Sequence, residues 1–166
     1  MKKPSKKKVS KSRKIKNPRT TIVICSSAAF YKQVIEVQKQ LKAMGFKVLV
    51  PLTAGKMEKS GDYRVETYKT WFKDANTYDR KTFLTKHHFN KVAKGDVVLV
   101  LNYEKNGKSG YIGGAVLMEM GLGLYLGKKI YILNPIDETV NYKEEILCML
   151  PTILNGDLGS MAKLLK

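Results

Sequence analysis

The run Asp96-Val97-Val98-Leu99-Val100-Leu101 is the clearest strand in the chain. After its first residue it is apolar throughout and does not alternate with polar side chains, which is typical of a strand covered on both faces. Strands of that kind occur in parallel sheets that have helices packed on either side. This stretch therefore predicts an α/β sandwich, and the sequence on either side of it supplies the remaining elements.

The flanking sequence alternates between strand and helix patterns. The β-branched run 20–25 predicts the first strand, and the short apolar runs 47–50 and 129–133 predict the second and fourth. Helical patterns lie between and after these runs, at 30–44, 79–93, 112–126, 142–149 and 158–165. Parallel strands joined by helical crossovers give a doubly wound, flavodoxin/Rossmann-like α/β fold, here with a mainly parallel sheet of four to five strands sandwiched by helices.

The segment 52–76 has the least regular pattern in the chain, because polar and aromatic residues are mixed without a clear period. We expect a loop with a short helix lying over one edge of the domain. A long excursion of this kind is more often functional than idle.

The formal net charge of +17 is concentrated at the start of the chain. Segment 1–19 carries ten of the 31 Lys and Arg residues and none of the 14 acids, so the remaining residues carry about +7. Such a segment cannot bury enough apolar surface to offset its ordering entropy, so we expect a disordered basic tail at 1–19 and one α/β domain at 20–166. The tail suits non-specific contact with nucleic acid or another polyanion, and it equally suits a solvated arm that keeps the protein soluble.

Cysteine usage and hydropathy indicate a cytoplasmic protein. The two cysteines, Cys25 and Cys148, form neither a disulfide framework nor a metal-binding pattern. No signal-peptide core follows the basic start and no apolar run reaches the length of a membrane span, so we expect no membrane association. His87 and His88 are adjacent on one predicted helix and point in different directions, so we expect a surface or capping role for each and no metal site.

Glu119 is the residue whose position most needs an explanation. It lies about two turns into the apolar, glycine-flanked helix 112–126, where a carboxylate is costly to desolvate. A lone acid at such a place is a candidate nucleophile or acid/base group, because perturbed carboxylates cluster at functional sites. The alternative is a helix acid that has rotated to solvent, and position alone leaves both interpretations open.

Polar and glycine residues follow the predicted strands, at the edge where open parallel sheets bind ligands. Ser26-Ser27 come after the first strand, where they suit either a phosphate or sugar hydroxyl, or a plain helix N-cap. Asn102-Tyr103 follow the third strand, and Gly113-Gly114 permit close approach of a ligand or tight helix–sheet packing. The first strand lacks the glycine fingerprint of dinucleotide-binding folds, and the chain has no nucleoside-triphosphate P-loop.

Four features, in this order, carry a resemblance to a known group of proteins. The first strand leads to the small-residue loop 24–28, and Asp96 opens the third strand. The stretch 119–128 follows the pattern Glu-hydrophobic-Gly-x-small-x3-Gly-Lys, and the apolar strand 130–133 comes directly after it. With these features the chain resembles the nucleoside 2-deoxyribosyltransferase-like superfamily, which includes the deoxynucleoside 5′-monophosphate N-glycosidases. The resemblance covers residues 20–135.

The resemblance implies a reaction and roles for several residues. Glu119 would be the nucleophile that attacks the anomeric carbon of a nucleoside or nucleotide and forms a covalent glycosyl-enzyme. Asp96 would contact the sugar or help protonate the base, and Ser26-Ser27 would hold the sugar 5′ end or its phosphate. Asn102 and Tyr103 are added as substrate contacts because of their place after the third strand. The resemblance further implies a homodimer or larger assembly, and the carboxylate mechanism requires no metal or organic cofactor.

One departure from this pattern and two rival interpretations leave alternatives open. Several transferases carry an acid shortly before the nucleophile, where this chain has Ile112, Gly113 and Gly114, so hydrolysis is favoured over transfer. A second family, of nucleotide phosphoribohydrolases, is marked by Gly-Gly-x-Gly-Thr-x-x-Glu, but here Glu119 follows the glycine pair one residue too early and without the Gly-Thr. A third interpretation is a non-catalytic nucleotide- or RNA-binding module of the same fold.

Overall fold

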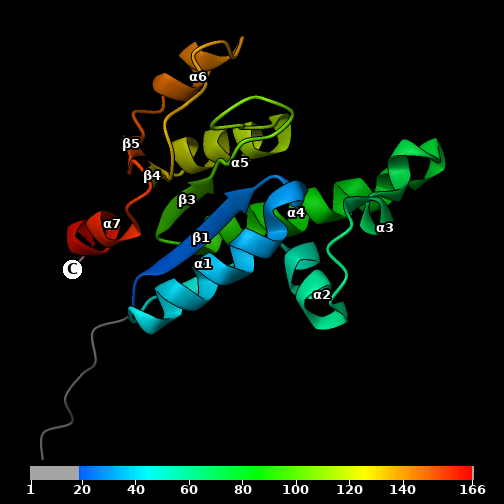
Figure 1. The fold of residues 1–166 in the computed structure, drawn as a ribbon, viewed down its shortest axis with the longest axis horizontal. Helices are drawn as coiled ribbons and strands as arrows, with labels where there is room; N and C mark the ends of the chain where they lie inside the picture. The colour runs from blue at the N-terminus through cyan, green and yellow to red at the C-terminus, as the bar shows by residue number, and fades with distance from the viewer. Residues whose placement is uncertain (1–18, 166) are drawn as a thin grey trace, which may run out of the picture.

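The structure is a computed structural model that describes residues 19–165. The expected basic tail, 1–19, therefore lies outside the described residues except for Arg19. Figure 1 shows a central sheet with helices packed around it. Across residues 19–165, no helix combines the length and the apolar composition needed to cross a bilayer.

Five parallel strands form the sheet in the order β2-β1-β3-β4-β5. They are β1 (Thr21–Ser26), β2 (Lys47–Leu49), β3 (Val97–Leu101), β4 (Lys129–Ile132) and β5 (Thr152–Ile153). This confirms the doubly wound α/β class. Because β2 follows β1 on one side and β3 lies on its other side, β1 and β3 form the switch point at whose carboxyl ends ligands bind in such sheets.

The longer helices begin and end within about two residues of the sequence-based expectation. The α-helices of the described residues are α1 (Tyr31–Ala43), α2 (Leu52–Ser60), α3 (Val65–Tyr68), α4 (Tyr78–Lys94), α5 (Gly114–Tyr125), α6 (Lys143–Leu147) and α7 (Leu158–Leu164). Short 3-10 turns precede α1 at Ala28–Phe30 and lie between α3 and α4 at Thr70–Phe72 and Ala75–Thr77.

The two faces of the sheet carry separate apolar cores, because side chains alternate along each strand. On one face, Ile22 and Ile24 of β1 pack with side chains of α1 and α7. On the other face, Val23 and Cys25 of the same strand pack with side chains of α4, α5 and α6. The alternation of β1 therefore directs the Cys25 side chain toward the layer that contains Glu119.

The segment 52–76 is more regular than the sequence analysis expected. It contains α2, α3 and two 3-10 turns, where we expected a loop with one short helix. Tertiary packing stabilises this segment: Ala54 belongs to the core formed with α1, and Met57 and Trp71 are buried as well. Contacts with α1 and α4 thus give the segment an order that its local pattern does not specify.

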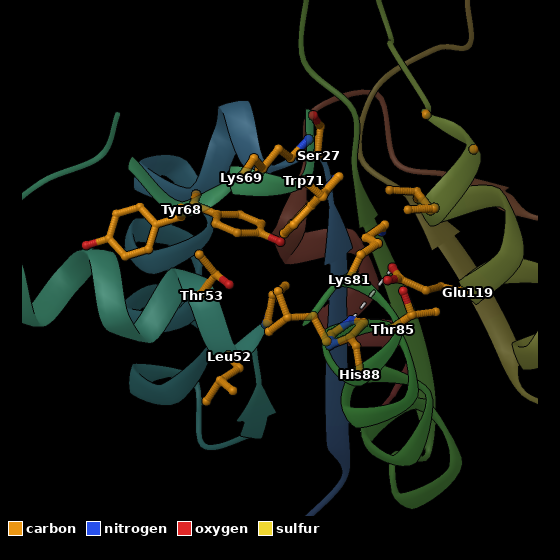
Figure 2. A pocket seen from close by; sticks show the side chains of 18 of the residues that line it. Ser27, Leu52, Thr53, Tyr68, Lys69, Trp71, Lys81, Thr85, His88 and Glu119 are labelled. Carbon is orange, nitrogen blue, oxygen red and sulfur yellow. Dashed lines mark ion pairs between the residues drawn. The ribbon is translucent and has the colours of Figure 1, made fainter. Parts of the chain in front are cut away.

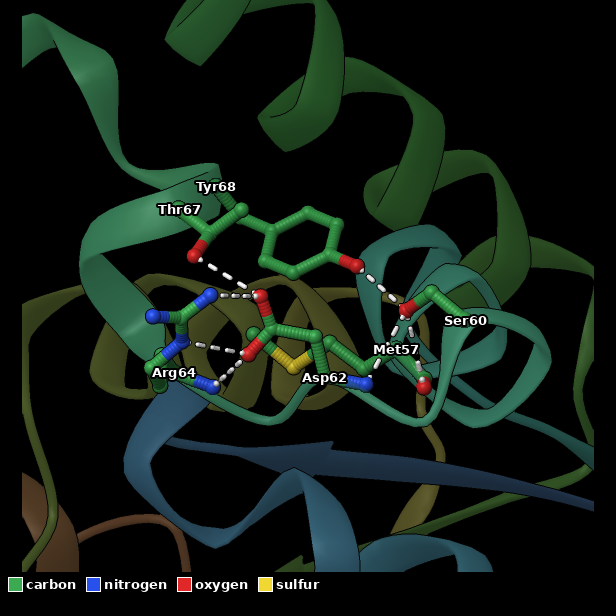
Figure 3. A network of polar contacts seen from close by, with 6 residues as sticks. All are labelled: Met57, Ser60, Asp62, Arg64, Thr67 and Tyr68. Atoms are coloured by element: carbon green, nitrogen blue, oxygen red, sulfur yellow. Dashed lines mark hydrogen bonds and ion pairs between the residues drawn. The ribbon is translucent and has the colours of Figure 1, made fainter.

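A polar network closes the connection between α2 and α3 (Figure 3). The Asp62 carboxylate accepts hydrogen bonds from the backbone and guanidinium of Arg64 and from the hydroxyl of Thr67. The Arg64 contacts hold the pKa of Asp62 well below its usual range. The hydroxyls of Ser60 and Tyr68 lie 2.7 Å apart, so this turn fixes the ring of Tyr68.

Asn102 ties together the two loops that follow β3 and β4. Its side chain is fully buried, donates to the carbonyl of Asn134 at 2.9 Å and accepts from the backbone N–H of Asn134 at 2.8 Å. The amide of Asn134 donates back to the Asn102 carbonyl at 3.1 Å. Gly110 lies against the same junction with a positive φ of 63°, and a Cβ there would lie 2.0 Å from the carbonyl oxygen of Pro135.

This close approach predicts that Gly110→Ala is much more costly than Gly107→Ala. Both glycines have positive φ, but a Cβ at Gly107 would meet nothing within 4 Å. We expect Gly107→Ala to lower the free energy of unfolding by about 1 kcal/mol, from the left-handed backbone alone. Gly110→Ala adds a backbone clash and is expected to cost roughly 3 kcal/mol or more. Urea denaturation of both variants measures the difference, and equal losses would contradict the packing argument.

Candidate active site

A cavity of about 190 Å³ lies beyond the carboxyl ends of β1 and β3. Its lining comes from several elements: Ser27 follows β1, Trp71 lies in the segment before α4, His88 belongs to α4, and Gly114 and Glu119 belong to α5. Figure 2 shows the Glu119 and His88 side chains approaching each other between α4 and α5. The cavity therefore occupies the place where this class of sheet binds ligands.

Four of the residues chosen from the sequence line this cavity, namely Ser27, Gly113, Gly114 and Glu119. Asp96 does not. It precedes β3, so it lies at the amino edge of a parallel sheet, and its carboxylate accepts a hydrogen bond from the backbone N–H of Thr21 at 2.6 Å. The sequence-based assignment of Asp96 to the same site as Glu119 is therefore corrected: Asp96 joins the starts of two strands.

Three other predicted contacts also lie outside the cavity lining. The Ser26 hydroxyl is buried and donates to the carbonyl of Leu101 at 2.8 Å. Asn102 has the structural role described above, and Tyr103 packs edge-on against Phe30 with 5.4 Å between ring centroids. These side chains hold β1 to β3 and close the neighbouring loops, so their effect on the site is indirect.

Glu119 is not turned toward solvent. Its side chain is 12% exposed, and its Oε2 atom is buried without a hydrogen-bond partner. Burial raises the pKa of Glu119 to about 7, although the Cys25 thiol and the Lys81 ammonium both favour the ionised form and reduce this effect. A carboxylate with such a pKa is present in both protonation states near neutral pH.

His88 is buried, which corrects the expected surface or capping role. Burial lowers its pKa to about 4, and the charges of Lys91 and His87 act in the same direction. The imidazole is therefore neutral at pH 7. The 3.7 Å contact between its Nε2 atom and Glu119 Oε2 (Figure 2) is then neither a pair of full charges nor short enough for a hydrogen bond. The neighbouring His87 is half-buried.

Cys25 completes a cluster with these two side chains. Its Sγ atom is fully buried and lies 3.5 Å from the same Nε2 atom of His88. Burial, followed by the negative charge of Glu119, raises the pKa of the thiol well above its usual range. The donor atoms of Cys25, His88 and Glu119 all lie within 4.8 Å of one another, so this group has the spacing to hold a metal ion.

The arrangement of the cluster differs from a nucleophile–base–acid relay. In a relay the nucleophile and the acid contact opposite nitrogens of the imidazole. Here Cys25 and Glu119 both face Nε2, and the Nδ1 atom of His88 is buried without a partner. Three donors thus converge on one point, and cysteine-based nucleophilic catalysis of the relay type does not follow from this geometry.

Three lysines, Lys69, Lys81 and Lys105, give the cavity an excess of positive charge. Burial and then the charges of Lys105 and Lys81 lower the pKa of Lys69, so the three ammonium groups are close enough to affect one another. Within the part of the chain that the structure describes, none of them pairs with a carboxylate at ion-pair distance. Lys81 lies over the ring of Trp71 and Lys105 over that of Tyr111. The cavity is suited to an anion.

Some of these residues could have been found from the sequence. Leu84, His88 and Val92 recur at helical spacing, and this repeat places His88 on the inner face of α4. Cys25 lies on the same side of β1 as Val23, by the two-residue period of a strand. The lysines lacked such a signal, because lysines are frequent throughout the chain and only the folded arrangement distinguishes these three.

The element order, the sheet order and this cavity define a class of protein, namely a doubly wound α/β domain with a polar site at the β1/β3 switch point. Within this class the chain has the nucleoside 2-deoxyribosyltransferase-like fold. A solved structure with this fold is that of a 2-deoxyribosyltransferase from the psychrotolerant bacterium Bacillus psychrosaccharolyticus, described as a biocatalyst for the synthesis of antiviral and antitumoral nucleosides. The match has a TM-score of 0.51 and 17% identity, and covers 86% of this chain and 96% of that chain.

No protein-family model and no curated protein sequence matches the chain. At 17% identity the likeness concerns the fold, and it confirms the fold that the sequence resemblance implied.

The raised pKa of Glu119 predicts a pH-dependent cost to stability. The folded state favours the protonated carboxyl of Glu119, so its protonation stabilises the fold. This contribution to the free energy of unfolding is complete below the unfolded pKa of 4.5 and is lost as the pH rises through about 7. Glu119→Gln removes this titration. Its stability relative to the wild type should therefore increase by roughly 3 kcal/mol between pH 4 and pH 8, as measured by denaturation in EDTA. The exposed Glu145→Gln variant is the control, and a constant difference for Glu119→Gln would contradict the burial argument.

Proposed function

We propose that the protein cleaves the N-glycosidic bond of a (deoxy)nucleoside 5′-monophosphate with Glu119 as the nucleophile. The observation that carries this proposal is a buried carboxylate, with an oxygen that lacks a hydrogen-bond partner, at a cavity on the switch point of the sheet. The fold supports the same reaction class, because the solved neighbour is a 2-deoxyribosyltransferase. We propose glycosyl transfer from a nucleoside as the general reaction class of this protein, and hydrolysis, with water as the acceptor, as its particular form.

In the first step, ionised Glu119 attacks the anomeric carbon of the sugar. A carbon–oxygen bond forms as the carbon–nitrogen bond to the base breaks, and the base leaves with the bonding electron pair. A desolvated carboxylate is suited to this step, because the positive charge that develops on the sugar is stabilised more strongly where water is excluded. The departing base takes its proton from water, since Asp96 lies at the opposite edge of the sheet.

In the second step, water attacks the same carbon and releases the sugar phosphate and Glu119. The water adds its hydroxyl to the sugar and gives up a proton, so the net reaction consumes one water for each base released. Gly113 and Gly114 leave the start of α5 without bulky side chains, and both line the cavity. Two of the three positions where several transferases carry an acid are therefore open, which favours water over a second nucleoside as the acceptor.

The phosphorylated form of the substrate is proposed from the lysines. Lys69, Lys81 and Lys105 come from three separate segments and line the cavity that contains Glu119. A neutral nucleoside would leave these mutually repelling charges uncompensated, whereas a phosphate would neutralise them and accept their hydrogen bonds. The Ser27 hydroxyl, at the end of β1, is an additional donor for the sugar or the phosphate.

Glu119→Gln tests the nucleophile. It keeps the shape of the side chain but removes the charge, so we expect release of free base from deoxynucleoside monophosphates to fall by about 1,000-fold or more. Base release is measured chromatographically in EDTA, with Glu145→Gln as a matched variant on an exposed position. Undiminished turnover in Glu119→Gln would exclude the nucleophilic role. Nucleotide binding without base release by the wild type would instead favour the binding-module interpretation.

Lys81→Gln tests the phosphate contact, with Lys86→Gln on the exposed side of the same helix as its control. We expect Lys81→Gln to lower kcat/KM for a nucleoside monophosphate by about tenfold or more, because a charged hydrogen bond is lost. Because the Lys81 ammonium also favours the ionised form of Glu119, the same change should lower kcat/KM for the unphosphorylated nucleoside as well, but by less than for the monophosphate. Equal losses for the two substrates would show that Lys81 does not read the phosphate.

The homodimer and the contact of segment 1–19 with nucleic acid stay predictions. Both are compatible with catalysis by the α/β domain, and neither is required for the steps above.

A further inference from the structure

We propose that Cys25, His88 and Glu119 form a binding site for a soft divalent transition metal such as Zn²⁺. The bound ion would coordinate the Glu119 carboxylate, which is the nucleophile of the proposed function. This goes beyond the glycosidase reaction, which needs no metal. The three residues come from β1, α4 and α5 and are separated by more than 30 positions in the sequence, so no local motif reveals them. Only the fold brings their donor atoms to one point.

The spacing of the donors agrees with a tetrahedral ion. Zinc binds thiolate sulfur at about 2.3 Å and imidazole nitrogen at about 2.0–2.1 Å, so a tetrahedral angle separates S and N by about 3.5 Å, and N and O by about 3.4 Å. The corresponding separations here are 3.5 Å for Cys25 Sγ to His88 Nε2 and 3.7 Å for His88 Nε2 to Glu119 Oε2. The third pair, Cys25 Sγ and a Glu119 oxygen, lies within 4.8 Å, and the tetrahedral value for S and O is about 3.6 Å, so an ion requires side-chain adjustments of at most about 1 Å.

The convergence on one nitrogen is the feature that favours a metal over other uses of the cluster. A hydrogen-bonded pair would use Nε2 once, but here a thiol and a carboxylate both approach it. An ion placed between the three donors would satisfy all of them. It would also supply a positive charge to Glu119 Oε2, which is buried without a hydrogen-bond partner.

The donor set indicates which metals the site prefers. Thiolate and imidazole ligands suit Zn²⁺ and its probe Co²⁺, whereas Mg²⁺ and Ca²⁺ prefer oxygen ligands. Three protein ligands leave a fourth position, and because His88 and Glu119 line the cavity, a water molecule can reach the ion from there. Binding displaces the thiol proton of Cys25, so the ion exchanges with a proton and no redox step is involved.

Occupation of the site weakens nucleophilic attack by Glu119. A carboxylate that donates electron density to a divalent ion is a weaker nucleophile, so we expect Zn²⁺ to inhibit base release and EDTA to restore it. The Lys81 ammonium, which interacts with the same carboxylate, opposes a cation. We therefore expect Lys81→Gln to bind the metal more tightly than the wild type, in contrast to its weaker use of nucleotides.

The decisive experiment is titration of the full-length, EDTA-treated protein with Co²⁺ in the absence of any nucleotide. The expected result is saturable 1:1 binding with a thiolate-to-cobalt charge-transfer band in the near ultraviolet and visible bands of tetrahedral Co²⁺, both removed by added Zn²⁺. Cys25→Ser should abolish the charge-transfer band, and His88→Gln and Glu119→Gln should each weaken binding by tenfold or more.

The chain offers a matched control for two of these ligands. Cys148→Ser removes the other, exposed cysteine, and His87→Gln removes the adjacent histidine, and both should leave the spectrum unchanged. Circular dichroism identifies any variant that fails to fold, and the wild-type spectrum tests the proposal without a variant. Absence of a thiolate band in the wild type, or its persistence in folded Cys25→Ser, would overturn the proposal. Because no substrate is present, these outcomes are independent of whether base release is observed.

Discussion

Desolvation of the Glu119 carboxylate is the constraint on which the rest of the site depends. The side chain lies between α4 and α5, next to the end of β1, and little of it reaches solvent. Burial raises its pKa to about 7, while a thiol and an ammonium limit the increase. The neighbours therefore leave a carboxyl that is costly to ionise but still ionises near neutral pH. Such a group reacts readily with a developing positive charge, and the same property makes it available to a cation.

The electrostatic character of the cavity combines this acid with three lysines. Lys69 and Lys105 add positive charge without carboxylate partners among the described residues, while Lys81 interacts with Glu119 itself. A ligand that matches this pattern has an anionic part and a part that becomes electropositive during reaction. A nucleotide has both, because its phosphate is anionic and its sugar acquires oxocarbenium character as the base leaves. The charge distribution thus favours the substrate class of the proposed reaction.

The sequence predicted the fold and the position of Glu119 better than it predicted the neighbours of Glu119. The apolar run of β3 and the glycine-flanked helix α5 are local patterns, so their periods were sufficient to place them. Asp96 was assigned to the site because it resembles an acid of a related group, yet a residue before a parallel strand lies at the edge opposite the cavity. Asn102 does follow β3, but its amide is used by the junction with Asn134.

The convergence of Cys25 and His88 on Glu119 could not be derived in the same way. It depends on how α4 and α5 pack against β1, and the helical repeat of α4 gives only the direction in which His88 points. The cavity residues of segment 52–76 could not be predicted from the sequence either. Contacts with α1 and α4 order this segment, and its own sequence does not specify which residues reach the cavity. Long-range packing decided both cases.

The nucleophilic and metal-binding roles proposed for Glu119 use different oxygens of its carboxylate. Oε2 is buried and faces His88, so it is the atom that a metal ion in the cluster would contact. The Glu119 side chain also lines the cavity, and its small exposed part is where a sugar would be attacked. Because the charge of a carboxylate is shared by both oxygens, an ion on one of them lowers the nucleophilicity of the other. A metal in the proposed site would therefore control the proposed reaction through the carboxylate that it shares with the sugar.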